Sequence, residues 1–248
     1  MRVAVVTGAS RGIGAAIAER FAREGVRVVG VSRTPVESEL NGEFAQADVS
    51  RPAEVEQLME DVVERHGRLD VVVNNAAIEH EGTVVETSPE DWDHVMAVNL
   101  RSVFLCAKYA IPHLSKTRGA IINVASVDGL WAEPSLAAYC AAKGGVVALT
   151  RAIAVDHGRD GVRCMCICPS YVATGMLEQF YDAQPDPAAA RAGAAALHPL
   201  GRISTPEEVA ALAVWLSSDD ASFATGQAYV LDGGLTAGRT HAQEGHAT

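Results

Sequence analysis

The chain has 248 residues, of which 48% are hydrophobic, so it holds enough apolar material for a sizeable core and global disorder is excluded. Its formal net charge is −11 and no basic run is present, which makes nucleic acid and anionic membrane surfaces poor partners. The five cysteines lack the spacing of a secreted disulfide framework, and no stretch is typical of a signal peptide or a membrane span. We therefore expect a cytoplasmic protein.

Short β-branched runs alternate with longer helix-like segments along the chain. Strands are predicted at 2–8, 26–32, 43–49, 69–77, 119–126, 162–170 and 226–234, and helices at 12–25, 52–67, 88–114, 135–158 and 205–218. Alternation of this kind, with strands apolar on both faces, is typical of a parallel sheet covered by helices on each side. The sequence predicts an α/β fold, a single doubly wound Rossmann-type domain over residues 1–238 with a seven-stranded parallel sheet.

Three regions break this alternation. Residues 33–42, between the second and third predicted strands, are too few for a full crossover helix. Residues 175–200 are rich in alanine and interrupted by proline, which fits either a pair of surface helices or a substrate lid, since long excursions in compact domains are often functional. Residues 239–248 are predicted to be a polar C-terminal tail, in which His241 and His246 do not indicate a metal site.

The segment "TGASRGIG", residues 7–14, follows the first predicted strand and opens the first predicted helix. Its glycines, Gly8, Gly12 and Gly14, would let the backbone approach a pyrophosphate, and the helix N-terminus would offer free N–H groups. A glycine-rich turn made only for tight packing is the alternative. The position in the first βα turn favours a dinucleotide site.

A second pattern, "YCAAK", places Tyr139 and Lys143 four residues apart on one face of a predicted helix. A phenol has an ordinary pKa of about 10, and a nearby ammonium favours its ionised form, which suits proton transfer near neutral pH. Ser126 lies at the carboxyl end of the fifth predicted strand, where ligands bind in open parallel sheets. These three residues predict a site for acid–base chemistry.

Taken together, "TGASRGIG", "NNAA", the pair Val98–Asn99, Ser126, "YCAAK" and "CPSYVAT" stand in the order and spacing of the short-chain dehydrogenase/reductase family, and the resemblance extends over residues 2–234. It implies an oxidoreductase that transfers a hydride between a nicotinamide cofactor and a carbonyl or secondary alcohol. It implies Tyr139 as general acid/base and Ser126 as the residue that polarises the substrate oxygen. Lys143 would bind the nicotinamide ribose and depress the pKa of Tyr139, and Asn99 would hold a water in a proton relay.

The resemblance also implies the residues that contact the cofactor. They are Gly8, Ser10, Arg11, Gly12, Ile13, Gly14, Ser32, Arg33, Asp48, Val49, Asn75, Ala76, Tyr139, Lys143, Pro169, Val172 and Thr174. Asp48 and Val49, at the end of the third predicted strand, match positions beside the adenine. The chain departs from the family at Ala77 and Ser170, where glycine is usual, and at Met165, where asparagine is common. Ser170 puts the backbone geometry beside the nicotinamide in question.

The identity of the nicotinamide cofactor depends on the end of the second predicted strand. An NAD-preferring enzyme usually carries Asp or Glu there, and this chain has Ser32 followed by Arg33. A guanidinium can bind a 2′-phosphate, and Arg11 adds a second cation in the glycine loop. The sequence favours NADP(H), with NAD(H) possible if Arg33 is only a solvated loop residue.

The substrate site is less readable than the cofactor site. Asp128 and Tyr171, with Ser126, are candidate substrate contacts, and Trp131 and Glu133 lie in the same predicted loops. Consecutive residues such as Glu79–His80–Glu81 cannot easily converge on one ion, so no metal is expected, and this segment could border the substrate pocket.

The alternating cysteines Cys164, Cys166 and Cys168 share one face of a predicted strand, where neighbouring side chains are too far apart for a disulfide. They are predicted to serve as small buried hydrophobic residues.

Three functions remain open at this stage. The first is an NADP(H)-dependent alcohol dehydrogenase or carbonyl reductase, and the second is an NAD(H)-dependent dehydrogenase of a cyclic diol, sugar or hydroxysteroid. The third is a non-catalytic protein that senses the cofactor, since fold does not dictate function. Apolar surface on the helices around residues 99–114 and 137–155, together with the family resemblance, predicts a homotetramer, or failing that a dimer.

Overall fold

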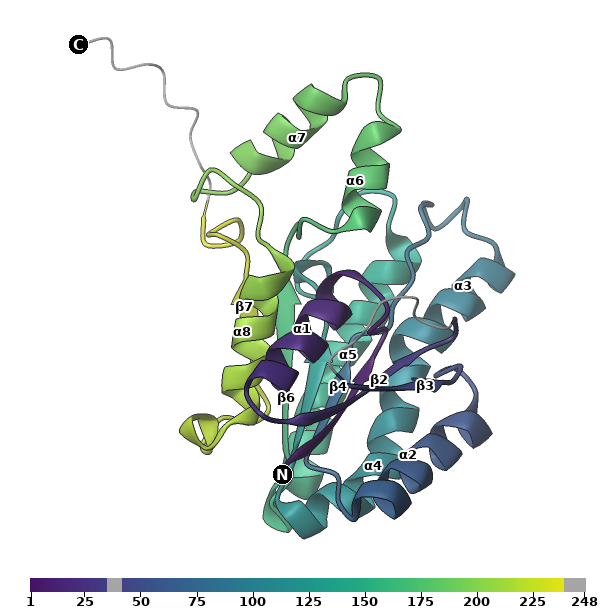
Figure 1. The fold of residues 1–248 in the computed structure, drawn as a ribbon. Helices are drawn as coiled ribbons and strands as arrows, with labels where there is room; N and C mark the ends of the chain where they lie inside the picture. Colours follow the sequence, from purple (N-terminus) through teal and green to yellow (C-terminus); the bar gives the residue numbers. More distant parts are fainter. Residues whose placement is uncertain (35–41, 239–248) are drawn as a thin grey trace, which may run out of the picture.

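A computed structural model describes residues 1–34 and 42–238 of the chain. Seven parallel strands form one sheet in the order β3-β2-β1-β4-β5-β6-β7 (Figure 1). The strands are β1 (Val3–Thr7), β2 (Arg27–Ser32), β3 (Glu43–Gln46), β4 (Val71–Asn74), β5 (Ala120–Val124), β6 (Arg163–Pro169) and β7 (Ala228–Leu231). The predicted Rossmann-type sheet is confirmed. The strand order reverses between β1 and β4, where such sheets bind their ligands.

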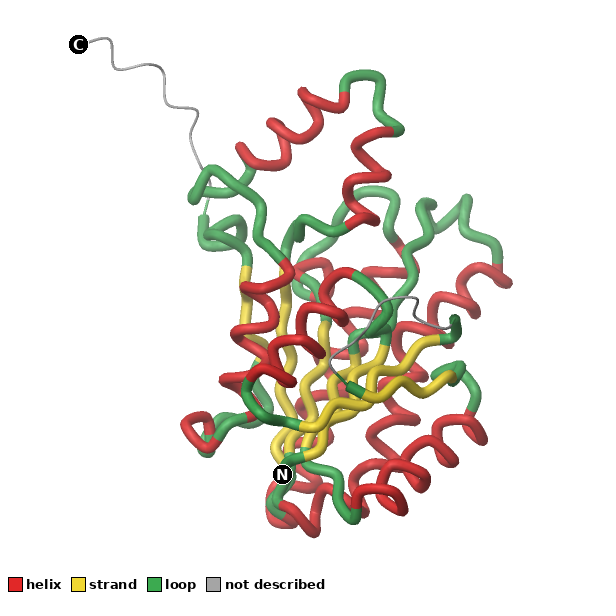
Figure 2. Tube along the Cα trace, viewed as in Figure 1, coloured by secondary structure: helices red, strands yellow, loops and turns green. Residues whose placement is uncertain are grey.

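Helices cover both faces of this sheet (Figure 2). They are α1 (Gly12–Arg23), α2 (Pro52–His66), α3 (Pro89–Met96), α4 (Ser102–Thr117), α5 (Ala137–His157), α6 (Gly175–Asp182), α7 (Pro187–Ala196) and α8 (Pro206–Ser217). Val6 of β1 packs with residues of α1 and α8, whereas its neighbour Val5 packs with residues of α2 and α4 on the other face. Successive strand side chains point to opposite faces, which is why these strands are apolar throughout.

The segment predicted as one helix over 88–114 consists of α3, a π-helical turn at Ala97–Arg101 and α4, which continues to Thr117. Ser88 caps α3, its hydroxyl accepting a hydrogen bond from the Asp91 backbone N–H. π-Helical turns are uncommon and often lie at functional sites. This one carries Asn99.

Two helical stretches are long and apolar enough to span a membrane by length and composition, Pro89–Thr117 and Ala137–Asp160. In this fold 50% and 44% of their most apolar windows are buried within the protein. Leu105 and Leu114 of α4 and Ile153 of α5 belong to the core beneath the sheet. Apolar residues of both stretches therefore pack in the hydrophobic core of this fold.

The alternating cysteines lie in β6 as predicted. Cys164, Cys166 and Cys168 are each 0% exposed and free of disulfides, which confirms them as buried small residues. Met165 and Ile167 alternate with them and pack against the opposite face of the sheet.

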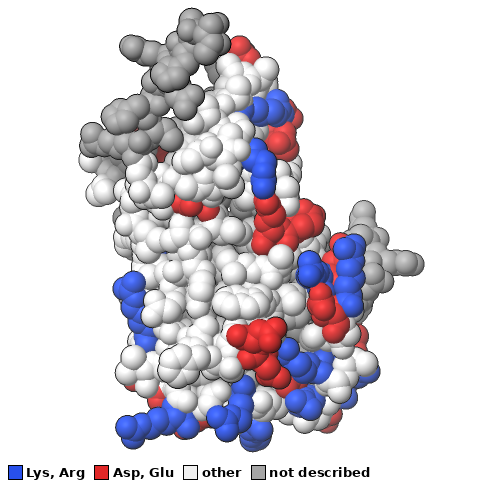
Figure 3. All heavy atoms as spheres, turned by 90° about the vertical axis from the view of Figure 1, so that its left-hand side faces the viewer, with Lys and Arg blue, Asp and Glu red and all other residues white. Residues whose placement is uncertain are grey.

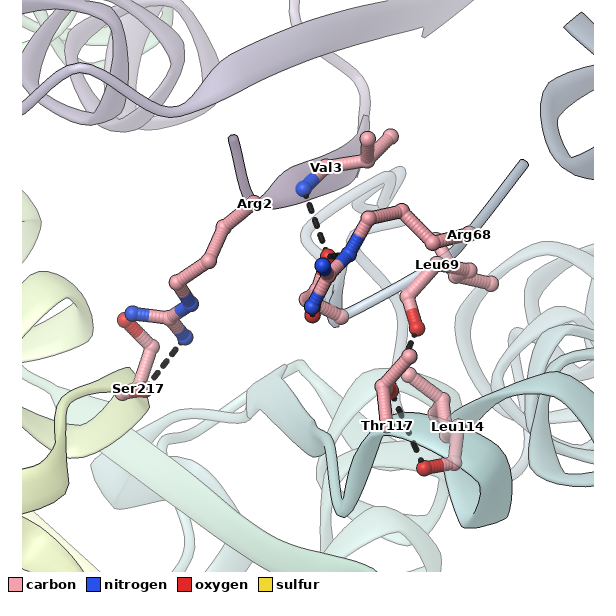
Figure 4. Close-up of polar contacts among 8 residues, drawn as sticks. Arg2, Val3, Arg68, Leu69, Leu114, Thr117 and Ser217 are labelled. Carbon is pink, nitrogen blue, oxygen red and sulfur yellow. Dashed lines mark hydrogen bonds and ion pairs between the residues drawn. The ribbon is translucent and has the colours of Figure 1, made fainter. Parts of the chain in front are cut away.

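Polar contacts of Asp70 and Thr117 hold the amino end of the sheet, and Figure 4 shows the partner residues Val3, Arg68 and Leu69. The buried carboxylate of Asp70 accepts a hydrogen bond from the Val3 backbone N–H at 2.8 Å and two from the guanidinium of Arg68, at 2.6 and 2.9 Å. Thr117, at the end of α4, donates its hydroxyl to the carbonyl of Leu69 at 2.7 Å. These contacts fix β1, β4 and α4 to one another at the end of the sheet opposite to the cavities described below.

Residues 175–200 form the helix pair α6 and α7, which stands beyond the carboxyl ends of the strands (Figure 1). The pair of helices that the sequence offered as one interpretation of this region is therefore present. The predicted tail at 239–248, and most of the short connection predicted at 33–42, lie outside the described residues.

Candidate active site

Two adjoining cavities open at the carboxyl end of the sheet. The first, of about 680 Å³, runs from the loop after β2, across the loop after β1, to the ends of β5 and β6. The second, of about 410 Å³, lies between the loops after β4 and β5 and helix α6. Both are lined by the same six residues: Ile13, Ser126, Tyr139, Ser170, Val172 and Thr174. A ligand in either cavity can therefore reach one in the other.

The glycine loop forms the floor of the first cavity, and its shape fits a phosphate group. Gly12 has a φ of +56°, a conformation that favours glycine, and Arg11 at the start of α1 makes no side-chain cap. The N-terminus of α1 therefore presents uncapped backbone N–H groups to the cavity, which is the usual arrangement for binding an anion.

Gly14, unlike the other glycines of the loop, does not line this cavity. A Cβ on Gly14 would lie 2.2 Å from the Gly8 carbonyl oxygen, and the residue is buried. Its function is to let helix α1 approach the loop closely. Every other residue predicted from the family resemblance to contact the cofactor lines the first cavity.

The loop is fastened to the segment that follows β4. The Thr7 hydroxyl oxygen accepts hydrogen bonds from the backbone N–H groups of Asn75 and Ala76, at 2.9 and 3.1 Å. The Asn75 side chain donates in return to the carbonyls of Thr7 and Gly8, at 3.1 and 3.2 Å. Asn75 thus holds the glycine loop at a fixed distance from the segment after β4. Its side-chain nitrogen is already hydrogen-bonded to that loop.

The far end of the first cavity carries Ser32, Arg33, Asp48 and Val49. Asp48 and Val49 follow β3 instead of ending it, because the strand stops at Gln46. Burial alone would raise the pKa of Asp48, but hydrogen bonds from Ser50 and the positive charge of Arg33 hold that pKa below its ordinary value. Arg33 is exposed and contributes a positive charge to the rim of this cavity.

Tyr139, Lys143 and Ser126 come together where the two cavities meet. The Lys143 ammonium lies 5.4 Å from the centre of the Tyr139 ring and donates to the Val124 carbonyl at 2.8 Å. Lys143 is 3% exposed, and its burial lowers its pKa to about 8. Ser126 follows β5 and lines both cavities. The three predicted residues therefore share one site.

The expected depression of the Tyr139 pKa is wrong for the protein alone. Burial of the phenol raises this pKa above its ordinary value, and the negative charges of Glu79 and Asp128 raise it further. A hydrogen bond with Ser126 acts in the opposite direction. Burial, followed by the charges of Glu79 and Asp128, therefore sets the direction of this pKa shift.

Asn99 lines neither cavity. Its side chain is 1% exposed and makes two hydrogen bonds with the Ile78 backbone, accepting from the N–H and donating to the C=O, each at 2.8 Å. The π-helical turn aims this amide at the segment after β4. Asn99 fixes the backbone that leads into the second cavity.

The second cavity contains Asp128 and Tyr171, which the sequence predicted as substrate contacts. Asp128 accepts a hydrogen bond from the Ser126 hydroxyl at 2.9 Å and donates its backbone N–H to the same oxygen at 3.1 Å. Glu79, Glu81, Trp131 and Glu133 also line this cavity. Leu177, Phe180 and Leu235 also line the cavity. Sequence reasoning missed Leu177 and Phe180 because the 175–200 region has no periodic signal that assigns its side chains to a site, and it missed Leu235 because this residue follows the last strand without a motif.

Among residues 1–34 and 42–238, no group of three His, Cys, Asp or Glu side chains is arranged to hold a metal ion. His80 does not converge with its two neighbouring glutamates. Its ring nitrogen lies 3.8 Å from the Asp91 carboxylate on α3.

Ser170, which departs from the family pattern, has a specific partner. Its hydroxyl oxygen lies 2.8 Å from Nε2 of His198, whose Nδ1 lies 2.8 Å from the carbonyl oxygen of Ala194 in α7. A carbonyl only accepts, so Nδ1 carries the hydrogen, and in the neutral ring Nε2 accepts from Ser170. His198 is 3% exposed and packs edge-on against Tyr171, with ring centres 5.9 Å apart. The pair therefore ties helix α7 to the turn that both cavities share.

A sheet of this order, a glycine loop at the start of α1 and a Tyr–Lys pair beside a serine define an oxidoreductase of the nicotinamide-dependent class. A family profile described as enoyl-(acyl carrier protein) reductase matches residues 8–236. The chain belongs to the short-chain dehydrogenase/reductase family, whose members act on CH–OH groups with a nicotinamide cofactor.

Similar proteins include several dehydrogenases of small hydroxylated molecules. The meso-2,3-butanediol dehydrogenase of Serratia marcescens is 44% identical, with 95% of each chain covered. The L-fucose dehydrogenase of Oryctolagus cuniculus is 40% identical, covering 96% of this chain and 86% of that protein. The structure of Thermoplasma acidophilum aldohexose dehydrogenase superposes with a TM-score of 0.94 at 32% identity, covering 98% of this chain and 97% of the other. The protein is therefore an oxidoreductase of alcohols or sugars.

The Ser170–His198 bond makes a prediction for stability. Ser170→Gly restores the residue usual in the family and leaves a buried imidazole nitrogen without its partner. We expect the free energy of unfolding to fall by about 1–3 kcal/mol. His198→Leu also destabilises, but the double variant loses less than the sum of the two, because both polar groups are then absent.

Urea denaturation at one protein concentration measures these changes. Ser222→Gly, at an exposed turn, is the matched control and changes the free energy of unfolding by less than about 0.5 kcal/mol. Strict additivity of the two single variants would show that Ser170 and His198 are not coupled.

Proposed function

We propose that the protein interconverts a secondary alcohol and its carbonyl compound with NADP(H), and that Tyr139 is the general acid/base. The observation that carries this proposal is the position of Tyr139, Ser126 and Lys143 at the junction of a cavity that fits a dinucleotide and a second cavity of substrate size. A substrate hydroxyl group at this junction would lie within reach of both cavities.

The roles of the three side chains follow from their chemistry. When bound, the cofactor accepts the hydride from the alcohol carbon or supplies it to the carbonyl carbon. In oxidation, the ionised Tyr139 oxygen takes the hydroxyl proton, and in reduction the neutral phenol returns it. The Ser126 hydroxyl donates to the substrate oxygen, which requires it to turn from Asp128. The Lys143 ammonium favours the ionised phenol and can bind hydroxyls of a ribose in the first cavity.

Replacement of the phenol tests this assignment. Tyr139→Phe removes only the oxygen, so we expect turnover of a panel of neutral alcohols and carbonyl compounds to fall by at least about 100-fold. Cofactor affinity stays within about threefold, since the glycine loop is untouched. Absorbance at 340 nm reports turnover, and fluorescence titration reports cofactor binding. Because burial raises the Tyr139 pKa, wild-type oxidation rises with pH as the phenol ionises.

A wild-type protein that binds the cofactor tightly but turns over no alcohol or carbonyl compound, neutral or charged, would favour a cofactor-sensing function. Turnover that survives Tyr139→Phe unchanged would instead assign the proton transfer to another group.

The preference for NADP(H) over NAD(H) rests on Arg33. Arg33 lines the first cavity next to Ser32, and Ser32 stands at the position where NAD-preferring enzymes usually carry a carboxylate. A 2′-phosphate there would form charge-assisted hydrogen bonds with Arg33 and with the Ser32 hydroxyl. An NAD(H)-dependent dehydrogenase of a diol or sugar is the alternative, since relatives with those names are similar to this chain.

Charge reversal at Arg33 distinguishes the two cofactors. We expect Arg33→Asp to lower the ratio of kcat/KM for NADP⁺ to that for NAD⁺ by at least about tenfold, because the new carboxylate repels the 2′-phosphate. Arg23→Asp, on the exposed face of α1, makes the same change of charge away from the cavity and leaves the ratio unchanged. An unchanged ratio in Arg33→Asp contradicts the assignment.

We further propose that α6 and α7 act as a substrate lid. Leu177 and Phe180 of α6 line the second cavity, and Gly175 lines the first, so the position of α6 determines the shape of both. The Ser170–His198 pair would set the resting position of α7.

A homotetramer is the assembly that we propose, in a cytoplasmic setting. Large apolar side chains are exposed on two faces: Phe104 of α4 and Val155 of α5 on one, and Trp215 of α8 and Val230 of β7 on the other. Figure 3 shows uncharged atoms over much of the face that includes α8 and β7, with Lys and Arg gathered along its lower edge. If each of the two faces associates with the same face of another copy, a tetramer forms. If only one face associates, a dimer forms.

Static light scattering at several protein concentrations measures the assembly. The expected mass is four times that of the 26.0 kDa chain. A stable monomer would contradict the proposal, and a dimer would show that only one of the two faces associates.

A further inference from the structure

We propose that the substrate is an alcohol with a positively charged group, a protonated amine close to the reacting hydroxyl, held by the carboxylates of Glu79, Asp128 and Glu133. The inference rests on the proposed function, because it takes Tyr139 as the reacting end of the second cavity. It adds the chemical class of the substrate.

The carboxylates reach this cavity from three separate parts of the chain. Glu79 and Glu81 follow β4, Asp128 lies in the short 3₁₀ turn after β5 (Val127–Gly129), and Glu133 lies between that turn and α5. All four line one space of about 410 Å³ together with Tyr139 and Ser126. The negative charge is therefore placed at the reacting end of the cavity and not on a remote surface.

These carboxylates act on one another. Burial raises the pKa of Glu79, and the charges of Glu81, Asp128 and Glu133 raise it further. Burial and the charge of Asp128 likewise raise the pKa of Glu133. Like charges that share a site destabilise their ionised forms, and a cation between them removes this cost.

The cavity wall supplies no opposite charge. Its lining residues within the described parts of the chain include no Lys, Arg or His, and none of the four carboxylates has an ion pair with such a side chain there. Lys143 is the cation whose charge acts on Asp128, but it lines the first cavity and donates a hydrogen bond to the Val124 carbonyl. A counter-charge for the second cavity therefore has to come from a bound molecule.

Aromatic side chains in the same cavity give a second, independent reason to expect a cationic ligand. Trp131, Tyr171 and Phe180 line the same cavity, and Trp131 and Phe180 are 47% and 44% exposed. Aromatic faces attract ammonium groups, and most strongly where both are partly removed from water. A neutral polyol would leave the carboxylate charges uncancelled, and an anion would be repelled. A small cationic alcohol satisfies both the carboxylates and the aromatic faces.

A series of substrates that differ in charge tests the inference. 1-Amino-2-propanol, 2-butanol and lactate all carry a CH₃–CHOH group, and their remaining substituents are cationic, neutral and anionic. We expect kcat/KM for the amino alcohol to exceed that for 2-butanol by at least about tenfold, and that for lactate by at least about 100-fold. The difference lies mainly in KM, because the charge is present in the bound substrate before reaction.

A second experiment removes two of the carboxylate charges from the protein and compares the same substrates. The double variant Glu79→Gln, Glu133→Gln keeps the size of both side chains, and we expect it to lower the preference for the amino alcohol over 2-butanol by about tenfold. Glu90→Gln, on the exposed side of α3, removes a charge outside the cavity and leaves the preference unchanged. The ratio between two substrates is not affected by a general loss of activity.

The outcomes separate this inference from the proposed function. If 2-butanol, 2,3-butanediol or an aldohexose is used as well as the amino alcohol, the function stands and the cationic substrate is excluded. If no alcohol or carbonyl compound is turned over, the function itself fails. If the double variant alters the affinity for oxidised relative to reduced cofactor but not the substrate ratio, the carboxylates serve the charge of the nicotinamide and the inference is overturned.

Discussion

The hydrogen bonds between Thr7 and the segment after β4 determine where both cavities can form. Thr7 ends β1, is 2% exposed, and holds the backbone of Asn75 and Ala76 at the point where the strand order reverses. Asn75 returns two hydrogen bonds to the glycine loop. These contacts join two halves of the sheet that are distant in sequence. They therefore fix the distance between the glycine loop and the segment after β4 that leads into the second cavity. At the opposite end, Asp70 joins β1 and β4 again, so the pair of strands is held at both ends.

The fold and most of the candidate site could be predicted from the sequence because they depend on local patterns. Valine-rich runs set the strands, Gly67 ends α2 in the left-handed conformation with a φ of 74°, and strand ends place Ser126 and Thr174 at one edge of the sheet. The resemblance then supplied roles for these residues. What it could not supply was the π-helical turn around Asn99, or the packing role of Gly14, since both depend on which backbone atoms meet in three dimensions.

The features that sequence reasoning missed are contacts and charges between segments that are far apart in the chain. The link from Ser170 to His198 spans 28 residues, and neither residue suggests the other by spacing. The Tyr139 pKa was expected to fall because Lys143 is close in sequence. Burial and the charges of Glu79 and Asp128, which come from other loops, raise it instead. The burial of the phenol and the charges around it depend on the assembled cavity. A local sequence pattern therefore cannot show their net effect on the Tyr139 pKa.

The carboxylates of the second cavity also act on the general acid/base that we propose. In the protein alone, two of the carboxylates that would bind an ammonium group, Glu79 and Asp128, add to the effect of burial and raise the pKa of Tyr139. An ammonium group held by Glu79 and Asp128 would offset both charges and thereby lower the pKa of the phenol. Binding of a cationic substrate would then increase the ionised fraction of its own general base, whereas a neutral alcohol of the same size would leave the phenol as it is. The same carboxylates would in this way contribute to substrate selection and to the timing of proton transfer.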